Sequence, residues 1–372
     1  MSAFCNRNAV AEVHTFTIKH TREDEDMKYR LLGQTGLYVS ELCLGTMTYG
    51  SAGFWKVMGG LDQKAVTAQV KYAFERGVNF IDTANVYSLG QSEELVGQAI
   101  RKLGLPRDEL VIATKATGVM NDLPNGLGQS RYHLMNEVDA SLKRLQLDHI
   151  DLYQLHGLDP LTPLEEALET LNDLVRSGKV RYIGLCNLSA WQIMKGLAIS
   201  ERRSWARFAS VQAYYTIAGR DLEREVLPLI RDQSLGLMVW SPLAGGLLTG
   251  KFSPEGKGPA NSRRSKFDFP VVDKERAFRC VEAMRPMAAE RSVSIARVAL
   301  AWLLAQQPVS SVIIGAKTMK QLKDNLGATQ VTLNAAELET LDEVSRLPEE
   351  YPGWMLDRQV QYRAKPPERK ED

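Results

Sequence analysis

The sequence predicts a parallel (β/α)8 TIM barrel, an α/β fold in which eight strands close into a cylinder and a helix follows each strand. Three observations favour it. Short apolar runs alternate with helical periodicity from residue 41 to residue 327 of the 372-residue chain. That length suits eight strand and helix units. No stretch within it has the composition of a linker between domains.

A doubly wound parallel sheet is the competing architecture. Its dinucleotide-binding form starts with a GxGxxG turn directly after the first strand. No such turn follows the first buried run, residues 41–46. The barrel is therefore the predicted fold.

A hairpin is expected before the first barrel strand. Two short runs with apolar content, residues 29–32 and 37–40, flank Gly33-Gln34-Thr35-Gly36, which is a hairpin signal. Residues 1–26 lack the basic start and apolar core of a secretory signal, and we expect a disordered or loosely attached extension there. The domain proper would then start at Met27.

The barrel elements follow from two periodicities. In the first helix, residues 63–75, Val66, Val70, Ala73 and Phe74 share one face. Further strands are expected at residues 78–82, 110–114, 150–155, 180–185, 208–212, 235–240 and 312–314. Further helices are expected at residues 92–103, 131–145, 163–177, 190–199, 222–233, 274–291, 295–305 and 319–327.

Three strands end in ionisable side chains, namely Asp82, Lys115 and His156, and Tyr87 follows Asp82 in the next loop. The loops after the strands form the functional face of a (β/α)8 barrel, so these four side chains are expected to converge. Taken singly, each is more often structural than catalytic. Together they fit one mechanism of proton transfer to a reacting group.

Composition and charge exclude several classes of partner. The 46 Lys and Arg residues against 45 Asp and Glu leave a formal charge of +1, which gives no reason to expect nucleic acid or an anionic membrane. No apolar run approaches the roughly 20 residues that span a bilayer. The four cysteines lie far apart without a C-x-x-C pair, which favours a reducing, cytoplasmic location.

Two further functional classes are disfavoured. A metal-dependent hydrolase needs several His, Asp or Glu ligands at strand ends, and only His156 and Asp82 qualify, so no metal site is predicted. Residues 245–251 match the first part of a phosphate-binding loop. However, Phe252 stands where Ser or Thr is required, and Pro254 interrupts a following helix.

The motifs together resemble the aldo-keto reductase superfamily. They are Phe80-Ile81-Asp82-Thr83-Ala84 followed by Tyr87, then Thr114-Lys115, then Leu155-His156, with supporting stretches at residues 186–189, 211–215, 240–243 and 315–318. The local sequence pattern is similar to that of the branch that contains potassium-channel beta subunits and many bacterial reductases. The resemblance implies one barrel domain over residues 27–347, with the hairpin closing the barrel bottom. Residues 348–372 would form a C-terminal tail near the barrel mouth.

The resemblance also implies an activity, the NADPH-dependent reduction of an aldehyde or ketone to an alcohol by hydride transfer. Tyr87 would donate the proton, and because a phenol has an ordinary pKa of about 10 it needs help near neutrality. The Lys115 ammonium, held by Asp82, would lower that pKa, and neutral His156 would donate a hydrogen bond to the substrate oxygen. The alternative is a regulatory or redox-sensing subunit that binds the cofactor with little turnover. A homo-oligomer is compatible with either.

The family binds NADP(H) in an extended pose. Asn187 and Gln212 would hold the carboxamide, Trp240 would lie near the nicotinamide, and Lys251, Arg263 and Lys317 are candidates for the 2′-phosphate or else solvated surface charges. The implied cofactor-binding residues are Thr46, Asn187, Gln212, Trp240, Ser241, Leu243, Gly245, Lys251, Arg263, Lys317, Thr318, Gln321 and Asn325. The Gly-rich and basic segment 244–273 would cover the cofactor.

Two departures from the family pattern affect the cofactor prediction. Cys186 stands where a serine often precedes the asparagine, and Gln321 stands where many members have arginine. NADP is therefore favoured over NAD without being fixed. Substrate contacts are expected from Trp55, from the 118–128 loop and from the tail with Tyr351, Trp354 and Met355. These aromatic side chains suggest an apolar or aromatic carbonyl compound, or else they seal the barrel mouth.

Overall fold

The computed structural model describes residues 15–17, 27–255, 258–260 and 262–364. Within them, eight strands close a barrel in the order β10-β11-β4-β5-β6-β7-β8-β9, and every neighbouring pair is parallel. The strands are β4 (Leu42–Gly45), β5 (Phe80–Asp82), β6 (Val111–Ala116), β7 (Ile150–Leu155), β8 (Val180–Cys186), β9 (Phe208–Tyr214), β10 (Gly236–Trp240) and β11 (Val309–Ile314). The predicted fold is confirmed.

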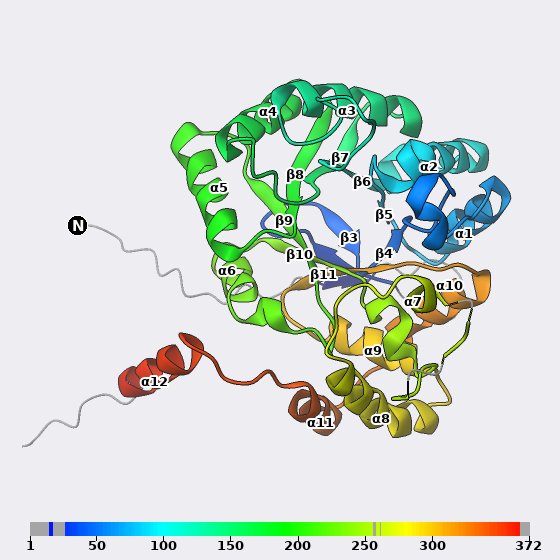
Figure 1. Cartoon of the computed structure of the whole chain (residues 1–372), viewed down its shortest axis with the longest axis vertical. Coiled ribbons are helices and arrows are strands. Elements are labelled where there is room, and N and C mark those ends of the chain that lie inside the picture. Colours follow the sequence, from blue (N-terminus) through cyan, green and yellow to red (C-terminus); the bar gives the residue numbers. More distant parts are fainter. Residues whose placement is uncertain (1–14, 18–26, 256–257, 261, 365–372) are drawn as a thin grey trace, which may run out of the picture.

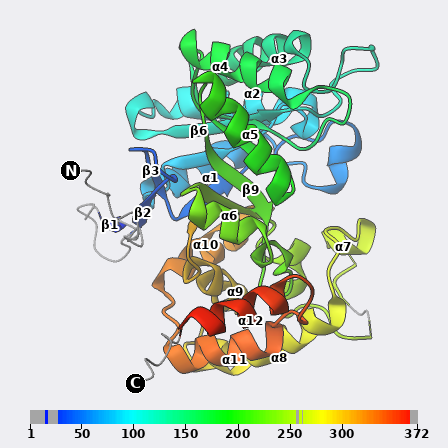
Figure 2. The same ribbon diagram turned by 90° about the vertical axis from the view of Figure 1, so that its left-hand side faces the viewer.

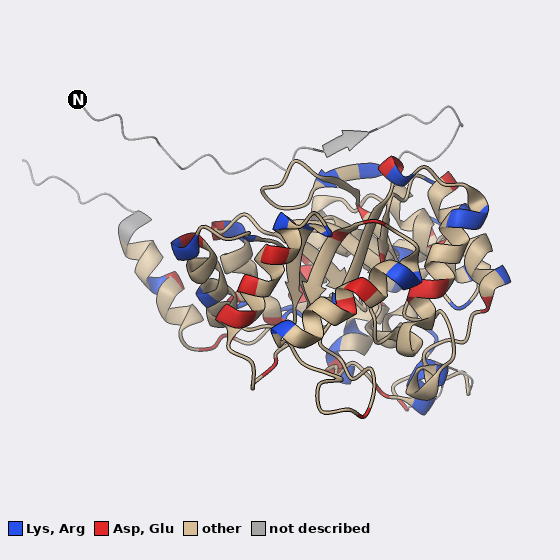
Figure 3. Ribbon diagram, turned by 90° about the horizontal axis from the view of Figure 1, so that it is seen from above, with Lys and Arg blue, Asp and Glu red and all other residues tan. Residues whose placement is uncertain are grey.

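Helices surround the barrel in Figure 1. They are α1 (Gln63–Glu75), α2 (Gln91–Leu103), α3 (Arg131–Leu145), α4 (Leu164–Arg176), α5 (Ala190–Arg203), α6 (Val226–Asp232), α8 (Lys274–Glu290), α9 (Ile295–Leu304) and α10 (Met319–Leu326). Their apolar faces pack against the outward side chains of the strands to form the main core. Figure 3 shows Lys and Arg interspersed with Asp and Glu on the side of the molecule that it presents, in keeping with the net charge of +1.

The hairpin closes one end of the barrel, as predicted. Strands β2 (Lys28–Leu31) and β3 (Tyr38–Ser40) pair antiparallel. Leu32 and Val39 are fully buried and pack with the inward side chains of the barrel strands. Gly33, with φ +63°, approaches so closely that an added Cβ would lie 2.6 Å from the Ala209 carbonyl oxygen. Figure 2 shows the hairpin at one end of the molecule and α7 (Arg263–Lys266) at the other.

Most elements differ from their predicted bounds by a few residues, and two of the differences have a clear local cause. Strand β11 begins before residue 312 because Ser310 and Ser311 donate hydrogen bonds to the hairpin carbonyls of Leu31 and Ser40, which satisfies polar groups that the apolar pattern did not include. The helix expected at residues 222–233 is a 3-10 turn, Asp221–Glu223, followed by α6. Pro228 lies in the first turn of α6, where a missing N–H is tolerated.

The two ends of the chain bear on the predicted domain bounds. Of the expected extension, only Thr15–Thr17 are described, and this strand, β1, pairs antiparallel with β2; the rest lies outside the described residues. The C-terminal helix α12 (Gly353–Ala364) lies beyond the ring of barrel helices in Figure 1. The position of the tail near the barrel mouth stays a prediction.

No helix within the described residues combines the length and the apolar character that crossing a membrane requires. Helix α11 (Ala335–Ser345) precedes the tail and packs against α8.

Candidate active site

An ion pair lies at the carboxyl ends of β5 and β6. The Lys115 ammonium is 2.6 Å from Asp82 Oδ2 and donates to the Thr83 carbonyl oxygen at 2.7 Å. Both side chains are buried, Lys115 completely. Burial alone would lower the pKa of Lys115, but the adjacent Asp82 carboxylate reverses this and raises it above the ordinary range. The site therefore contains a permanent buried cation.

Tyr87 and His156 lie beside that cation. The Lys115 Nζ atom is 5.1 Å from the centroid of the Tyr87 ring, and the Tyr87 and His156 rings are 5.7 Å apart at 74°. Burial lowers the pKa of His156 to about 3, and Lys115 acts in the same direction. His156 is therefore neutral at physiological pH and can donate one ring N–H. The structure brings all four predicted catalytic side chains together.

The pKa of Tyr87 moves in the opposite direction to the sequence-based expectation. Burial raises it to about 12, and the lowering effect of Lys115 is too small to compensate. The sequence indicated the cation but not the extent of desolvation, which depends on how the barrel closes around the ring. Tyr87 is thus a protonated phenol in the free protein, which is the state that a proton donor needs.

Two glutamine amides hold the other oxygen of Asp82. Gln212 Nε2 donates to Oδ1 at 2.9 Å and Gln154 Nε2 at 3.2 Å. Gln212 Nε2 also donates to Gln154 Oε1 at 3.2 Å, and the Cys186 thiol lies 3.9 Å from the same oxygen. Gln154 was not among the predicted site residues. Its signal is the period of two, which puts Leu152 and Gln154 on the inner face of β7 and His156 at the next position of the same alternation, directly after the strand.

Asn187 joins the end of β8 to His156. Its backbone has φ +57°, and its amide donates to the His156 carbonyl oxygen at 3.2 Å. Trp240 Nε1 donates to Asn187 Oδ1 at 2.9 Å, and the indole stacks on Phe269 with 5.9 Å between centroids and 9° between planes. The predicted nicotinamide residues Asn187, Gln212 and Trp240 therefore lie in one connected group with the four predicted catalytic side chains, here called the tetrad: Asp82, Tyr87, Lys115 and His156.

A second group of predicted residues surrounds the start of α10. Thr318 caps that helix by accepting from the Gln321 backbone N–H at 3.2 Å, and Gln321 Oε1 accepts from the Lys317 N–H at 2.8 Å. Asn325 donates to the Gly315 carbonyl oxygen at 3.2 Å. This end of α10 carries exposed N–H groups and the positive end of the helix dipole, which suits an anion.

Basic residues of the long loop after β10 affect the pKa of Lys317. Burial lowers the pKa of Lys317, and Arg263, Lys266 and Lys251 lower it further. Burial lowers the pKa of Arg263 to about 10, with Arg264 adding to the effect, and burial followed by Arg263 lowers the pKa of Lys251. The basic residues therefore repel one another. A bound anion would relieve the repulsion.

The remaining predicted residues lie on the segments between these groups. Thr46 Oγ1 donates to the Asp82 carbonyl oxygen at 3.1 Å, and Ser241 Oγ accepts from the Gly245 N–H at 3.3 Å. Gly245 has φ +65°, and a Cβ there would lie 2.6 Å from an Arg263 nitrogen. Leu243, before the 3-10 helix Ala244–Thr249, packs against the main core.

A row of aromatic side chains lies beside Tyr87. The Trp55 ring, on the 3-10 helix Gly53–Val57, is 5.1 Å from the Tyr87 ring at 62°. Phe54 meets Phe267 of the long loop at 5.1 Å, and Phe267 lies 5.5 Å from Phe269. Trp55 was predicted to contact the substrate, but its connection through Phe54 to the phenylalanines of the long loop depends on tertiary packing. Tyr351 and Trp354 are exposed on the tail.

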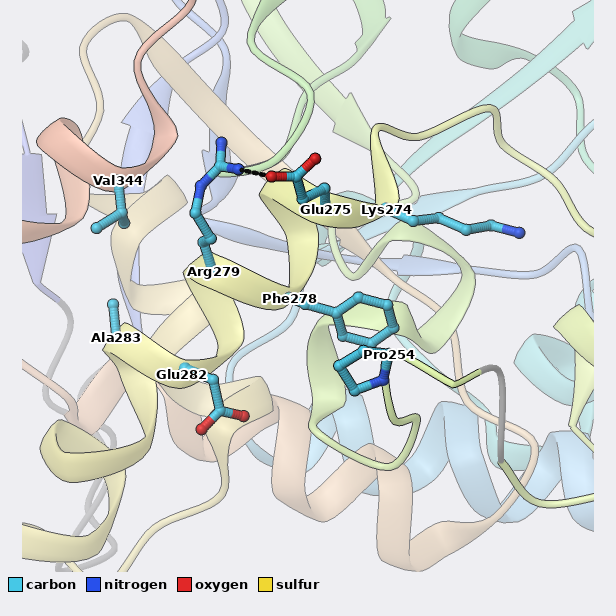
Figure 4. A pocket seen from close by; sticks show the side chains of 8 residues that line it. All are labelled: Pro254, Lys274, Glu275, Phe278, Arg279, Glu282, Ala283 and Val344. Atoms are coloured by element: carbon cyan, nitrogen blue, oxygen red, sulfur yellow. Dashed lines mark hydrogen bonds and ion pairs between the residues drawn. The ribbon is translucent and has the colours of Figure 1, made fainter.

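A separate pocket of about 690 Å³ lies on the outside of α8 (Figure 4). Figure 4 shows Pro254 and Phe278 side by side and the ion pair between Arg279 and Glu275, whose atoms are 3.0 Å apart. None of the tetrad residues lines this pocket. Among the residues that the structure describes, no group of three or more His, Cys, Asp or Glu side chains is arranged to hold a metal ion.

Comparison with known proteins agrees with this geometry. The aldo/keto reductase family model matches residues 41–346. An uncharacterized oxidoreductase of Bacillus subtilis, YrpG, is 38% identical over 86% of this chain and 96% of its own. The versiconal hemiacetal acetate reductase of Aspergillus parasiticus is 34% identical over 85% of this chain and 96% of its own.

A plant relative belongs to the branch that the sequence resembles. A probable voltage-gated potassium channel subunit beta of Oryza sativa is 37% identical over 82% of this chain and 92% of its own. Both the family match and these identities cover most of the chain. The protein therefore belongs to the aldo/keto reductase family and is an NAD(P)H-dependent oxidoreductase.

Proposed function

We propose that this protein reduces an aldehyde or ketone to an alcohol with NADPH, and that Tyr87 donates the proton. The observation that carries the proposal is the meeting of a protonated phenol, a charged Lys115 and a neutral His156 at one end of the barrel. Carbonyl reduction requires a donor at the oxygen and a group that stabilises the charge developing there.

The basic residues support NADP(H) over NAD(H). Burial lowers the pKa of Lys251, of Arg263 and of Lys317, neighbouring cations lower each of them further, and the Arg263 Nε atom is buried without a hydrogen-bond partner among the described residues. A 2′-phosphate would supply the missing acceptor and neutralise the repulsion. NADPH, when bound, supplies a hydride from its nicotinamide ring. Thr318 and Gln321 would complete the phosphate site.

The amide groups of the site fit the carboxamide of that ring. Both N–H groups of Gln212 are used by Asp82 and Gln154, so its carbonyl oxygen remains as an acceptor. Asn187 retains one N–H and one lone pair beyond its bonds to His156 and Trp240. Together they offer a donor and two acceptors to one amide.

Each of the four tetrad side chains has its own role in the proposed reaction. His156 donates a ring N–H to the substrate oxygen and orients the carbonyl. As negative charge develops on that oxygen, the Tyr87 O–H proton moves to it, and the nearby Lys115 ammonium stabilises the phenolate that is left. Asp82 keeps Lys115 charged and in place through the 2.6 Å contact.

Aromatic side chains beside Tyr87 favour an apolar or aromatic carbonyl compound. Trp55 presents its ring to that of Tyr87, and Phe54 extends the apolar surface toward the long loop. Such surfaces bury flat apolar area. The fungal relative is named for the reduction of versiconal hemiacetal acetate.

The test is NADPH oxidation with 4-nitrobenzaldehyde and with methylglyoxal, with NADH run in parallel. Tyr87→Phe is expected to lower turnover by at least about a hundredfold, as loss of a general acid does, while NADPH still binds. The matched control is Tyr132→Phe, on the exposed surface of α3, which should retain full turnover. Full turnover by Tyr87→Phe would contradict the assigned role.

The choice of cofactor has its own pair of variants. Lys317→Met should weaken NADPH binding about tenfold or more, because a hydrogen bond to a charged group contributes ~1.5–3 kcal/mol, and should leave NADH binding within about twofold. Lys320→Met removes an exposed cation three residues further along, in the first turn of α10, and should change neither. Equal loss of both cofactors in Lys317→Met would contradict a 2′-phosphate site at this residue.

A cofactor-binding regulatory or redox-sensing subunit with little turnover is the second candidate. The observation in its favour is the similarity to probable potassium channel beta subunits of rice and Arabidopsis thaliana, at 37% and 36% identity. Tight NADPH binding without turnover of any carbonyl tested would favour this candidate.

A further inference from the structure

A buried network of charges lies behind the loop that carries Tyr87. Glu93 is fully buried at the start of α2, and its Oε2 atom is 2.6 Å from Arg144 Nε of α3. Arg144 also approaches Glu137 Oε2 at 3.4 Å, and Glu137 accepts from Asn85 Nδ2 at 2.8 Å. We propose that these four residues position Tyr87 over the Lys115 ammonium; the role in turnover rests on the proposed function.

The segment that they hold is strained. Directly after Tyr87, Ser88 and Leu89 have φ of +50° and +53°, and Gly90 has φ +93°. Non-glycine residues in this region are energetically unfavourable and persist only where the surroundings impose the conformation. Because the backbone conformation of Ser88 and Leu89 is unfavourable, contacts from outside the segment must hold it in place next to Tyr87.

The network touches the segment on both sides of Tyr87. Asn85, two residues before it, is fully buried and reaches Glu137. Gly90, three residues after it, lies so close to Arg144 that an added Cβ would be 2.6 Å from Arg144 Cδ. The phenol is therefore carried between two anchored points, and its place depends on both.

The same network contacts the strand of the lysine. Thr114 precedes Lys115 on β6 and donates to Glu93 Oε1 at 2.6 Å. The Asn85 backbone N–H donates to the Lys115 carbonyl oxygen at 3.1 Å. The same contacts therefore hold in place both the strand that carries Lys115 and the loop that carries Tyr87. This fixes the 5.1 Å separation between Lys115 Nζ and the Tyr87 ring.

Stability alone does not account for the network. Replacing a buried ion pair by well-packed apolar side chains is often neutral or stabilising, so such pairs are weak sources of folding free energy. Burial raises the pKa of Glu93, and Arg144 counteracts it. The hydrogen bonds and ion pairs of the network fix the positions of polar atoms in the loop. Apolar packing would not fix them. Asn85, Glu93, Glu137 and Arg144 are therefore positioning residues.

The test exploits the 2.8 Å contact between Asn85 and Glu137. Asn85→Asp places two carboxylates against each other and should push the loop out of place. A misplacement near 1 Å can cost about a hundredfold in rate, so we expect kcat for 4-nitrobenzaldehyde to fall about tenfold to a hundredfold. The NADPH dissociation constant should stay within about twofold, and amide hydrogen exchange in residues 83–90 should accelerate.

Rescue distinguishes positioning from general damage. Adding Glu137→Gln to Asn85→Asp replaces the repulsion with an amide that donates to the new carboxylate, and should restore both kcat and exchange protection to within about threefold of the original protein. Asn85→Ala, which introduces no charge, should show the same losses as Asn85→Asp if the latter does not fold. The matched control is Arg107→Met, which removes a half-buried ion pair with Asp151 and should leave kcat and exchange in residues 83–90 unchanged.

Three results would overturn the inference. They are unchanged kcat and exchange in Asn85→Asp, failure of Glu137→Gln to restore a folded double variant, or an equal loss of kcat in Arg107→Met. If the unaltered protein reduces no carbonyl compound, the proposed function fails. The exchange measurements on residues 83–90 then decide the structural part of the inference alone.

Discussion

Asp82 accepts hydrogen bonds from three side chains at once, and this decides the electrostatics of the whole site. Lys115 occupies Oδ2, while Gln154 and Gln212 occupy Oδ1. The Lys115 ammonium balances the charge of this buried carboxylate, and the two amides satisfy its other oxygen. Removing the cation would leave the charge buried and uncompensated.

Lys115→Met should therefore cost more stability than the loss of one ion pair suggests. Leaving one member of a buried pair unpaired lowers the free energy of unfolding by about 3–5 kcal/mol. Adding Asp82→Asn removes the orphaned charge and should recover most of that loss without recovering turnover. Urea denaturation followed by circular dichroism, with NADPH oxidation in parallel, measures both. A double variant no more stable than Lys115→Met would contradict the argument.

His156 makes the stability of the fold depend on pH. Its pKa falls from the ordinary value of 6.5 to about 3 in the folded protein, because burial and Lys115 both oppose its charge. Between about pH 6.5 and 3 the unfolded chain binds the extra proton, so stability falls as pH falls, by up to about 1.4 kcal/mol per pH unit. Above about pH 6.5 this residue has no effect.

His156→Asn should flatten that slope. Comparing urea unfolding of the variant and the original protein at pH 7, 6, 5 and 4 isolates the contribution of this residue from that of the carboxylates, which titrate in both proteins. The difference in unfolding free energy should be constant above about pH 6.5 and should shift in favour of the variant below it. Parallel pH profiles would show that His156 is not held neutral by the fold.

At the scale of elements, the hairpin determines how the barrel is closed at its lower end. The turn between β2 and β3 packs backbone against backbone on the starts of β9 and β10. An added Cβ on Gly33 would lie 2.6 Å from both the Ala209 carbonyl oxygen and the Gly236 backbone nitrogen. Neither backbone can move without disturbing a barrel strand. The turn therefore requires glycine for space as well as for its positive φ.

Gly33→Ala should destabilise the protein by about 1–3 kcal/mol, because it combines a strained φ with overpacking. Gly36→Ala lies in the same turn, where an added Cβ meets no atom within 4 Å, and it should be neutral within about 0.5 kcal/mol. The midpoint of urea unfolding measures both. Equal effects of the two substitutions would show that the hairpin does not press on the strands.

Elements with strict periodicity were predictable, and elements that depend on tertiary contacts were not. Helices α1 and α3 match their predicted ranges, because regular apolar spacing and caps at Asp62 and Ser130 define them locally. Strand β11 begins early because its serines meet the hairpin, which no local pattern shows. Helix α11 had a usable signal, the capping box of Asn334 and Glu337.

The same division applies to the candidate site. Strand-end position indicated Asp82, Lys115 and His156, because parallel strands in a barrel end on one face. The raised pKa of Tyr87 and the role of Gln154 beside Asp82 depend on what closes around them. Neither desolvation nor a partner more than 70 positions away in the chain can be inferred from local spacing.

At the scale of the whole molecule, the barrel and its tail differ in how they are held. The barrel helices bury their apolar faces on the strands, whereas Trp354, Leu356 and Val360 of α12 are 41%, 54% and 67% exposed. A helix of this length is marginally stable by itself in water. An ion pair between Arg224 and Glu350, which precedes the helix, ties this region to the barrel.

Removing residues 353–372 should therefore change neither stability nor turnover. The truncation retains Glu350 and its ion pair, and the described side chains of α12 that it removes bury little area, so the thermal midpoint should stay within about 2 °C, the shift that ~1 kcal/mol produces in a large domain. Thermal unfolding and NADPH oxidation with 4-nitrobenzaldehyde measure the two quantities. A rise in KM with an unchanged midpoint would mean that the tail reaches the substrate at the barrel mouth, as the sequence suggested, because a purely structural contribution would move the midpoint first.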